Sequence, residues 1–431
     1  MADSDNKIKI EKIKGFRDHY PEDMEIRHSI FTRITETAED FGYKRIDFPS
    51  LEYLDLYKLK SGSELVNQTF SFVDKGGREV TMIPEATPST VRLLTARKGM
   101  PKPVRWYSFP KVWRYEEPQE GRFREHYQFN ADLFGIDSAK VDAEIIGLAT
   151  SILDSLGLSG IYEININDRY LMEYILKDLN INDINNAFSI IDKYRKISRD
   201  SFVEMFRKLD ANDENINKII DFLSEKLDMN SLPKKLKKLL NNYKNIEDRI
   251  KRIQETSEYV SYYTQSTINF DFSVVRGLSY YTGIVFEAFD ITGKLRAILG
   301  GGRYNNLATL LSGEDIPAIG FALGDAVIEL LLKRQNLWER NMRKVSYYVC
   351  VLNDVNPEYP ITIAQKIRKT NKIASLDFTG RKLPAQLKSA TDFDYSIIIG
   401  NDEIKNNSVT LKNMKTVEQK VLSFDDFIKS L

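Results

Sequence analysis

Apolar residues recur at helical spacing near the start of the chain, between residues 22 and 41. They stand four positions apart, which places them on one face of a helix: Ile26, Ile30, Ile34 and Ala38. Gly42 follows them, and glycine commonly ends a helix. Short β-like runs come next, at 44–48, 69–73 and 80–83. The chain therefore opens with an amphipathic helix and several short strands.

The next segments predict a strand–turn–strand unit and then a run of helices. The strands are expected over 103–115 and 123–135, with a polar turn at Gly121 between them. A helical pattern covers 141–156. From about residue 168 to 257 the chain is rich in Lys, Asn, Asp, Ile and Leu at helical spacing, which predicts an inserted all-helical module.

A concentrated basic run lies inside this module, at residues 234–238. One interpretation is the solvated face of a helix. The other is a surface that faces RNA, since lysines beside a binding site neutralise phosphates. The pattern leaves both interpretations open.

The β-like pattern returns after residue 270. We expect strands at 270–275, 283–288, 294–299 and 319–323, the last leading into a helix. After a linker at 338–344, strand-like and helical runs alternate as far as Gly400. Such alternation predicts a small α/β domain with right-handed crossovers.

Composition narrows the class of protein. The 431 residues carry 62 Lys and Arg against 62 Asp and Glu, so the net charge gives no general signal for nucleic-acid binding. No apolar run approaches the ~20 residues of a membrane helix, and the polar start of the chain is unlike a secretion signal. A single cysteine, Cys350, excludes an internal disulfide and any multi-cysteine zinc site. We expect a cytoplasmic enzyme without a membrane partner, in which Cys350 is buried and inert.

Charged and amide side chains gather on the strand–turn–strand unit. Arg114 and Glu116 are two residues apart, so on a strand both side chains leave the same face. Gln128, Asn130 and Asp132 repeat this spacing on the returning strand. Such a face suits a phosphate at one end and an ammonium group at the other. A solvated hairpin with cross-strand salt bridges remains an alternative on the pattern alone.

This unit resembles motif 2 of the class II aminoacyl-tRNA synthetases, and within them the histidyl-tRNA synthetase family. The matching residues are Arg114-Tyr115-Glu116, the loop from Pro118 to Arg122, and Gln128 followed by Asp132. The resemblance implies that Asp132 reads the imidazole of the substrate.

A second segment, VRGLSYYTGIVFE from Val275 to Glu287, is similar to the Arg-Gly-Leu-Asp-Tyr-Tyr motif of the same family. The resemblance implies that Arg276 acts at the α-phosphate and the substrate carboxylate, and that Tyr280 and Tyr281 line the imidazole pocket. Ser279 replaces the usual Asp.

Further stretches match the family in order along the chain: Gly15 to Asp18, Pro84 to Thr87, Gly301 to Tyr304, and Gly380 to Leu383. The implied fold is α+β, with a class II catalytic domain built on an antiparallel sheet. The implied domains are a catalytic domain in two parts (1–166 and 258–336), a helical insertion (167–257) and a C-terminal α/β anticodon-binding domain (337–431).

The resemblance also assigns site residues. Arg114 and Arg276 are implied to be catalytic. The residues implied to bind histidine are Glu85, Ala86, Thr87, Arg114, Gln128, Asp132, Arg276, Tyr280 and Tyr281. Those implied to bind ATP are Arg114, Glu116, Arg122, His126 and Arg276. Mg²⁺ is implied with ATP, and its protein ligands are not assigned.

The chain departs from the family at the adenine and phosphate end of the site. In motif 3, Gly320 to Gly324 matches, but Val327 stands where the family has an ATP-binding arginine. His126 stands where a phenylalanine usually stacks on adenine. We expect Arg122, or another nearby cation, to substitute for the absent arginine.

The resemblance implies an enzyme that activates L-histidine with ATP and transfers it to tRNA(His), working as a homodimer. Two alternatives share the fold. One is a catalytically silent paralogue that acts as a regulatory subunit of histidine biosynthesis. The other is an RNA-binding sensor, which the departure at Val327 keeps open.

Overall fold

The computed structural model describes residues 11–58, 63–240, 243–276, 280–338, 344–352, 355–377 and 379–431. Residues 277–279, which include the Ser279 substitution, lie outside these ranges. The chain divides into two compact units, Met1–Asn341 and Met342–Leu431, and each is described by itself. Within the described ranges, no helix combines the length and apolar character that crossing a membrane requires.

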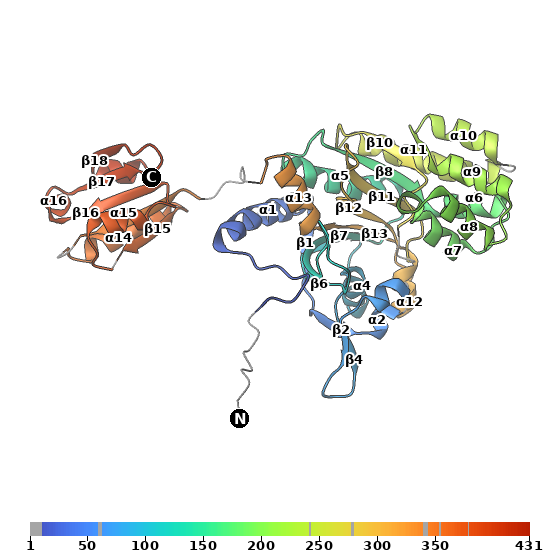
Figure 1. Cartoon of the computed structure of the whole chain (residues 1–431), viewed down its shortest axis with the longest axis horizontal. Helices are drawn as coiled ribbons and strands as arrows, with labels where there is room; N and C mark the ends of the chain where they lie inside the picture. The colour runs from blue at the N-terminus through green and yellow to red at the C-terminus, as the bar shows by residue number, and fades with distance from the viewer. Residues whose placement is uncertain are drawn as a thin grey trace, which may run out of the picture. The chain divides into compact units, whose positions relative to one another are not determined.

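A ten-stranded sheet forms the centre of the first unit (Figure 1). Its strand order is β1-β5-β7-β13-β12-β11-β8-β10-β9, and β6 pairs with β7 off this path. The strands are β1 (Lys44–Arg45), β5 (Val104–Ser108), β6 (Lys111–Trp113), β7 (Glu125–Phe134), β8 (Tyr162–Asp168), β9 (Lys226–Leu227), β10 (Ile268–Asp271), β11 (Ile284–Asp290), β12 (Leu299–Arg303) and β13 (Ala318–Gly324). The pairs from β5 to β8 along this order are antiparallel.

Alternation along β7 separates the two faces of this sheet. Phe129, Ala131 and Leu133 belong to the main apolar core. The residues between them, Gln128 and Asn130, share the opposite face and bond to each other, from Gln128 Nε2 to Asn130 Oδ1 at 2.8 Å. The expected polar face on the returning strand is therefore confirmed.

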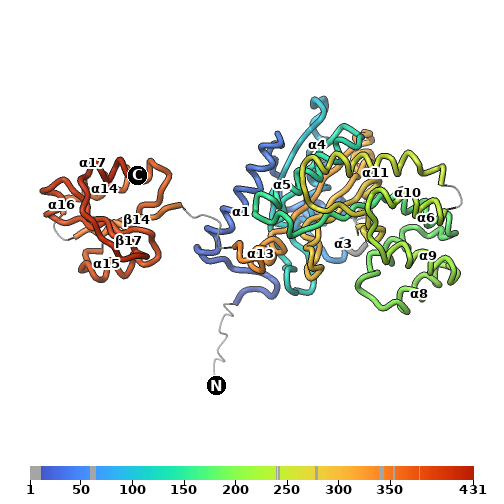
Figure 2. Tube along the Cα trace, turned by 90° about the horizontal axis from the view of Figure 1, so that it is seen from above, coloured from blue at the N-terminus to red at the C-terminus, as the bar shows by residue number. Residues whose placement is uncertain are grey.

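Helices cover the apolar face of the sheet. They are α1 (Pro21–Asp40), α5 (Ala139–Ser155), α11 (Glu247–Val260) and α13 (Asp325–Arg334). Helix α5 packs against α1 and α11 (Figure 2). The helix predicted near the start of the chain is confirmed as α1, with Ile30, Ile34 and Ala38 buried on one face.

The helical module predicted from composition is present as a run of helices with its own apolar core. Its members are α6 (Arg169–Asp178), α7 (Ile184–Ile191), η1 (Tyr194–Lys196), α8 (Arg199–Arg207), α9 (Asp213–Leu223), α10 (Ser231–Leu239) and η2 (Tyr243–Ile246), followed by α11. Asp168, Asp183, Ser198 and Asn212 cap four of these helices, as expected for Asp, Asn and Ser at that position. The basic run lies on α10, where Lys234, Lys237 and Lys238 are exposed and Leu236 is buried.

A smaller three-stranded sheet, ordered β2-β4-β3, projects from the first unit (Figure 1). Its strands are β2 (Leu51–Tyr53), β3 (Ser71–Val73) and β4 (Glu79–Met82). Nearby are the helices α2 (Asp55–Lys58), α3 (Ser63–Asn67), α4 (Thr87–Ala96) and α12 (Asn306–Ser312). Helix α4 packs against α2 and α12.

The second unit is a five-stranded sheet with helices, as its alternating pattern predicts. The strand order is β15-β14-β16-β17-β18. The strands are β14 (Ser346–Val351), β15 (Ile373–Asp377), β16 (Tyr395–Ile399), β17 (Ser408–Asn413) and β18 (Gln419–Ser423), and the helices are α14 (Glu358–Lys369), α15 (Leu383–Ser389), α16 (Asn401–Lys405) and α17 (Phe424–Lys429). Cys350 is buried on β14, and burial raises the pKa of its thiol. The expectation that Cys350 is buried is confirmed.

Three expectations about strands are wrong. The strand expected at 270–275 is instead Ile268–Asp271, and residues 272–275 lie beyond its end. The segment 103–115 is not one strand, because β5 and β6 are separated at Phe109 and Pro110, and proline cannot donate to the ladder. Arg114 and Glu116 lie beyond β6, where the Glu116 N–H bonds to the Arg114 carbonyl at 2.8 Å in a tight turn. The strand expected at 294–299 is instead Leu299–Arg303. Its glycines pair with β11 and β13 on both sides, and these close approaches leave little room for side chains.

Candidate active site

A cavity of about 800 Å³ lies against the face of the large sheet that carries Gln128. Most of the residues assigned from the sequence line it: Glu85, Thr87, Arg114, Glu116, Arg122, His126, Gln128, Arg276, Tyr280 and Tyr281. Ala86 and Asp132 lie behind the wall. Ala86 is fully buried in a small apolar cluster, and Asp132 bonds to Tyr304, which lines the cavity. Segments far apart in the sequence thus meet at one site.

Arg276 has a left-handed backbone conformation, with φ of 57°. Such a conformation costs about 1–3 kcal/mol for a residue with a side chain, and it is concentrated at functional sites. Its Nη1 donates a hydrogen bond of 2.6 Å to Glu287 Oε1. Gly300 pairs with Glu287 across the sheet, and a side chain at this position would collide with the Arg276 guanidinium. The glycine therefore makes room for the guanidinium.

The guanidinium of Arg276 is charged and has a spare donor. Burial lowers the pKa of this group, but Tyr281 and Glu287 raise it by more, so the net shift is upward. Among the described residues, its buried Nε has no hydrogen-bond partner. A buried N–H on a cation is suited to an anionic ligand oxygen.

Arg114 directly follows β6, at the start of the motif 2 loop, and is held by bonds to backbone carbonyls. Its Nε donates to the Pro84 carbonyl at 2.8 Å, and its N–H bonds to the Arg124 carbonyl at 2.9 Å. Beside it, Arg122 Nε lies 2.5 Å from Glu116 Oε2. These contacts fix two arginines and one carboxylate in the same cavity.

A buried polar network lies at the closed end. The Tyr280 hydroxyl donates to Glu85 Oε2 at 2.7 Å, and Tyr304 donates to Asp132 Oδ1. Burial raises the pKa of Asp132 to about 7; the bond from Tyr304 opposes this shift and Glu85 adds to it. Gly320 pairs with Asp132 on the adjacent strand, where any side chain would collide with the carboxylate. These carboxylate and hydroxyl groups therefore lie close enough together for one polar ligand to contact several of them.

The family model for histidyl-tRNA synthetase matches residues 15–326, and the model for the anticodon binding domain matches residues 347–431. The chain belongs to the histidyl-tRNA synthetase family. A histidine–tRNA ligase of Picrophilus torridus is 56% identical over 427 residues, which is 98% of this chain and 100% of the relative. Another from Thermoplasma volcanium is 52% identical over 426 residues, 98% of this chain and 99% of the relative.

A solved structure confirms the fold. The histidyl-tRNA synthetase from Nostoc sp. PCC 7120 superposes with a TM-score of 0.84 at 23% identity, covering 98% of this chain and 100% of that one. The predicted α+β fold, with a class II catalytic domain and a C-terminal anticodon-binding domain, is therefore confirmed.

The two departures at the adenine and phosphate end lie in the same cavity of this synthetase. Val327 and His126 both line it. Burial, together with the nearby Arg114, lowers the pKa of His126 to about 4, so its imidazole is neutral near pH 7. A neutral ring can stack on a base without adding charge.

Sequence reasoning missed several cavity residues of the synthetase: Lys193, Arg195, Glu287, Arg296 and Tyr304. Tyr304 and Glu287 stand inside quoted motifs, and their pairing with Asp132 and Arg276 depends on contacts between distant segments. Arg296 comes directly before an apolar, glycine-rich run. A cation just before such a run is the sequence feature that could have identified Arg296 as a site residue.

The helical insertion reaches the backbone of Arg276. Arg169, the first residue of α6, donates from Nη1 to the carbonyls of Val275 at 3.1 Å and Arg276 at 3.4 Å. Its guanidinium also lies 4.2 Å from the Phe188 ring centroid, over helix α7. The insertion therefore holds the strained residue from outside the cavity.

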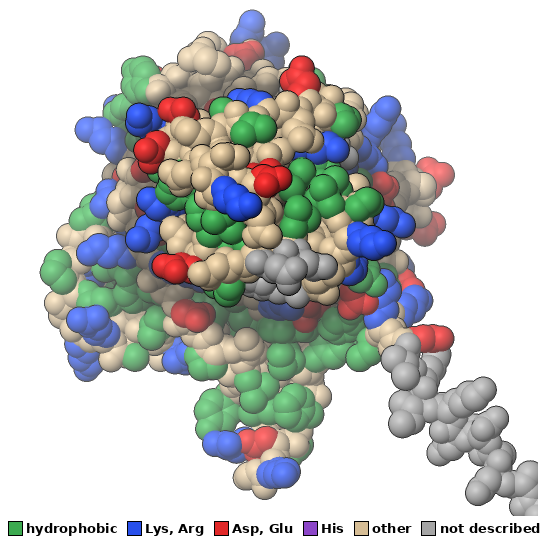
Figure 3. Space-filling view, turned by 90° about the vertical axis from the view of Figure 1, so that its left-hand side faces the viewer, with side chains coloured by type: hydrophobic (Ala, Val, Ile, Leu, Met, Phe, Trp, Pro, Cys, Tyr) green, Lys and Arg blue, Asp and Glu red, His purple; other side chains and the backbone are tan. Residues whose placement is uncertain are grey.

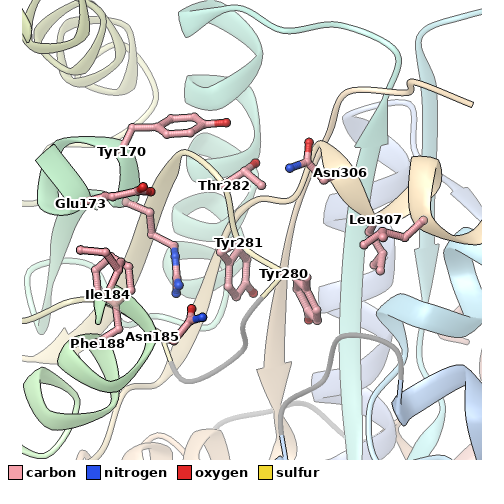
Figure 4. A pocket seen from close by; sticks show the side chains of 12 residues that line it. Tyr170, Glu173, Ile184, Asn185, Phe188, Tyr280, Tyr281, Thr282, Asn306 and Leu307 are labelled. Atoms are coloured by element: carbon pink, nitrogen blue, oxygen red, sulfur yellow. The ribbon is translucent and has the colours of Figure 1, made fainter. Parts of the chain in front are cut away.

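A second, smaller cavity of about 200 Å³ lies between the insertion and α12. Glu173 and Phe188 line it from the insertion, and Leu307 lines it from α12 (Figure 4). Tyr280 and Tyr281 stand between these groups and line both cavities. The insertion thus packs directly behind the two tyrosines.

Replacing Arg169 with alanine is expected to raise the KM for histidine by about 10-fold, because two charge-assisted bonds to the Arg276 loop are lost. Steady-state pyrophosphate exchange at varied histidine concentration measures this change. The matched control is Arg199→Ala, which removes an exposed arginine from the same module. A KM for histidine equal to that of the wild type would show that Arg169 does not position the loop.

Proposed function

We propose that this synthetase activates L-histidine with ATP to form histidyl-adenylate and pyrophosphate, and then transfers the histidyl group to the 3′ end of tRNA(His). The observation that carries the proposal is one cavity containing both Arg114 and Arg276, with Asp132 buried at its end. Relatives of nearly full length bear the name histidine–tRNA ligase.

Chemistry at the α-phosphate is assigned to Arg114 and Arg276. A carboxylate oxygen of histidine attacks the α-phosphorus, and the bond to the bridging oxygen of pyrophosphate breaks. Negative charge grows on the phosphoryl oxygens, and two guanidinium groups held in place stabilise it without reorganisation. In the second step the terminal ribose hydroxyl of tRNA attacks the activated carbonyl, and AMP leaves.

Histidine is proposed to lie with its ammonium group toward Glu85, Thr87 and Gln128, beside the backbone of Ala86. Asp132 and Tyr281 would meet the two imidazole nitrogens, with Tyr280 packed beside them. Support comes from burial: Glu85 is 2% and Asp132 3% exposed. A site that pairs both ring nitrogens leaves buried groups unpaired when another amino acid enters, which gives strong discrimination.

ATP is proposed to occupy the part of the cavity lined by Glu116, Arg122 and His126, as well as the two catalytic arginines. Mg²⁺ is proposed to accompany the nucleotide, and it would supply charge neutralisation at the phosphates. Mg²⁺ is commonly held by one or two carboxylates together with phosphates. Glu116 and Glu287 offer carboxylate oxygens in this cavity.

Replacing Arg122 with alanine is expected to raise the KM for ATP by about 10-fold or more, because a charge-assisted contact to phosphate is lost. The measurement is pyrophosphate exchange at varied ATP concentration. The matched control is Arg78→Ala, which breaks an arginine–carboxylate pair with Asp74 outside the cavity. An unchanged KM for ATP would remove Arg122 from the phosphate site.

The remaining assignments are part of the same proposal. The catalytic domain is proposed to span 1–166 and 258–336, the helical insertion 167–257, and the anticodon-binding domain 337–431. A cytoplasmic homodimer is proposed. Exposed apolar side chains on the projecting three-stranded sheet support a contact between copies: Leu51, Tyr53, Phe72 and Val73. Apolar side chains are seen on the lobe that projects downward in Figure 3.

The alternatives of a silent regulatory paralogue and an RNA-binding sensor are not favoured. The ligase relatives match over nearly the whole chain, and the C-terminal segment matches the anticodon binding domain model. The test is aminoacylation: purified protein, ATP and labelled histidine should charge tRNA(His) and not tRNA of another acceptor class. Failure to charge tRNA(His) while the protein is folded would refute the proposal.

A further inference from the structure

The ATP end of the cavity lacks a cation at Val327. In the family this position carries an arginine that binds ATP, and here an aliphatic side chain lines the cavity instead. Gly121 in the motif 2 loop lies close to it, since a Cβ at residue 121 would stand 3.7 Å from Val327 Cγ2. Position 327, which has no cation, therefore lies beside the motif 2 loop that carries Arg122.

Two arginines that contact the helix after motif 3, Arg17 and Arg27, are already bonded to its carboxylates. Arg17 Nη2 bonds to Asp325 Oδ2 at 3.0 Å, and its Nη1 to Glu329 Oε2 at 3.0 Å. Arg27 is bonded to the same two carboxylates of α13. Neither arginine lines the cavity. These guanidinium groups anchor the helix that follows motif 3.

Arg122 is also paired, through its 2.5 Å contact with Glu116. The other cavity arginines have protein acceptors as well: Arg114 bonds to Pro84, Arg195 to Asp271, and Arg276 to Glu287. Arg296 differs from them. Among the described residues it has neither a hydrogen bond nor an ion pair to a protein acceptor.

The strand register places Arg296 at the same end of the sheet as Val327. Leu299 at the start of β12 pairs with Leu323 near the end of β13. Arg296 precedes Leu299 and Val327 follows Leu323, so the two residues leave the sheet together and line one cavity. The Arg296 side chain is long enough to reach the part of the cavity that an arginine at position 327 would occupy.

We propose that Arg296 supplies the phosphate-binding cation that is absent at Val327, contacting the β- and γ-phosphates of ATP and therefore the pyrophosphate product. This inference rests on the proposed function and names a further positioning residue for it. The contact is made in the ground state, so it acts on the binding of ATP and pyrophosphate more than on the amino acid.

The electrostatics of the region support an anionic occupant. Burial lowers the pKa of Arg296, Arg122 lowers it further, and Glu116 raises it. Arg122 and Arg296 thus repel each other, and Glu116 is the carboxylate in the cavity that acts on both. A polyphosphate brings the negative charge that relieves this repulsion and gives Arg296 acceptors for its donors.

The test compares Arg296→Ala with the wild-type full chain in pyrophosphate exchange. We expect the KM values for ATP and for pyrophosphate each to rise about 10- to 100-fold, the size expected for a charged hydrogen bond. The KM for histidine and the inhibition constant of AMP should stay within about threefold, since neither ligand carries the distal phosphates. Arg296→Lys should recover part of the loss.

Two further variants sharpen the result. Lys294→Ala removes an exposed cation from the same segment and should leave the KM for ATP unchanged. Adding Val327→Arg to Arg296→Ala should restore ATP affinity, because the cation returns from the first turn of α13. If Arg296→Ala, or Arg296→Gln where the alanine variant does not fold, keeps wild-type KM values for ATP and pyrophosphate, the inference is overturned. If the wild type itself shows no histidine-dependent exchange, the proposed function fails first.

Discussion

Replacing Arg276 with alanine is expected to lower histidine-dependent pyrophosphate exchange by about 10²–10³-fold, the usual effect of removing one fixed donor to a developing negative charge. The backbone strain at this residue, the bond to Glu287 and the glycine beneath the guanidinium all hold its charge in one place. Since the contact strengthens as the α-phosphorus is attacked, kcat should fall more than the KM for either substrate rises.

The control for Arg276→Ala is Arg105→Ala. Arg105 forms a comparable half-buried pair with Glu144, its Nε lying 2.6 Å from Oε1, and it lies outside the cavity. Its loss should leave exchange within about threefold of the wild type. Circular dichroism and thermal unfolding establish that both variants fold. A loss below about tenfold for Arg276→Ala would show that this arginine does not act at the phosphate.

Replacing Asp132 with asparagine is expected to raise the KM for histidine by about 100-fold or more. The Asp132 side chain is 3% exposed. The amide N–H group of an asparagine at this position would face the imidazole and could not bond to water instead. The pH dependence should change as well. Because burial raises the pKa of Asp132 to about 7, the ionised acceptor forms as pH rises through 7. The wild-type kcat/KM for histidine should rise across this range, and the variant should lose that rise.

The Tyr304→Phe variant tests the hydrogen bond to Asp132 by itself, because the Asp132 carboxylate remains. The bond from Tyr304 lowers the pKa of Asp132, so removing it should move the rise in kcat/KM to higher pH while the carboxylate remains. The titration of free histidine, near pH 6.5, is common to all variants and cancels in the comparison. An Asp132→Asn enzyme with a KM for histidine within threefold of the wild type would exclude contact with the imidazole.

Local patterns predicted the elements that depend on local rules. The four-residue spacing of Ile30, Ile34 and Ala38 fixed the buried face of α1, because a helix repeats at that interval. The two-residue spacing of Gln128 and Asn130 predicted their shared face on β7 for the same kind of reason. The motif around Arg276 and Tyr281 placed both residues in the main cavity.

Local sequence patterns could not predict the contacts between segments that lie far apart in the chain. The residue at which β12 starts depends on its pairing with β11 and β13, which lie elsewhere in the sequence. This pairing determines which of the glycines belong to the strand. The bonds from Arg169 to the carbonyl of Arg276 join segments 107 positions apart. The presence of Arg296 and Val327 in one cavity follows from the register of two strands and not from a local pattern. Propensity does not encode such pairings, since tertiary contacts set them.

The central claim is that this cavity activates histidine with ATP. The most direct measurement is ATP–pyrophosphate exchange by the purified wild-type chain, with histidine, without an amino acid, and with each other amino acid in turn. We predict exchange that depends on histidine and stays near the blank with the others. Exchange that another amino acid supports equally well, or no exchange with histidine from a folded protein that binds ATP, would contradict the account.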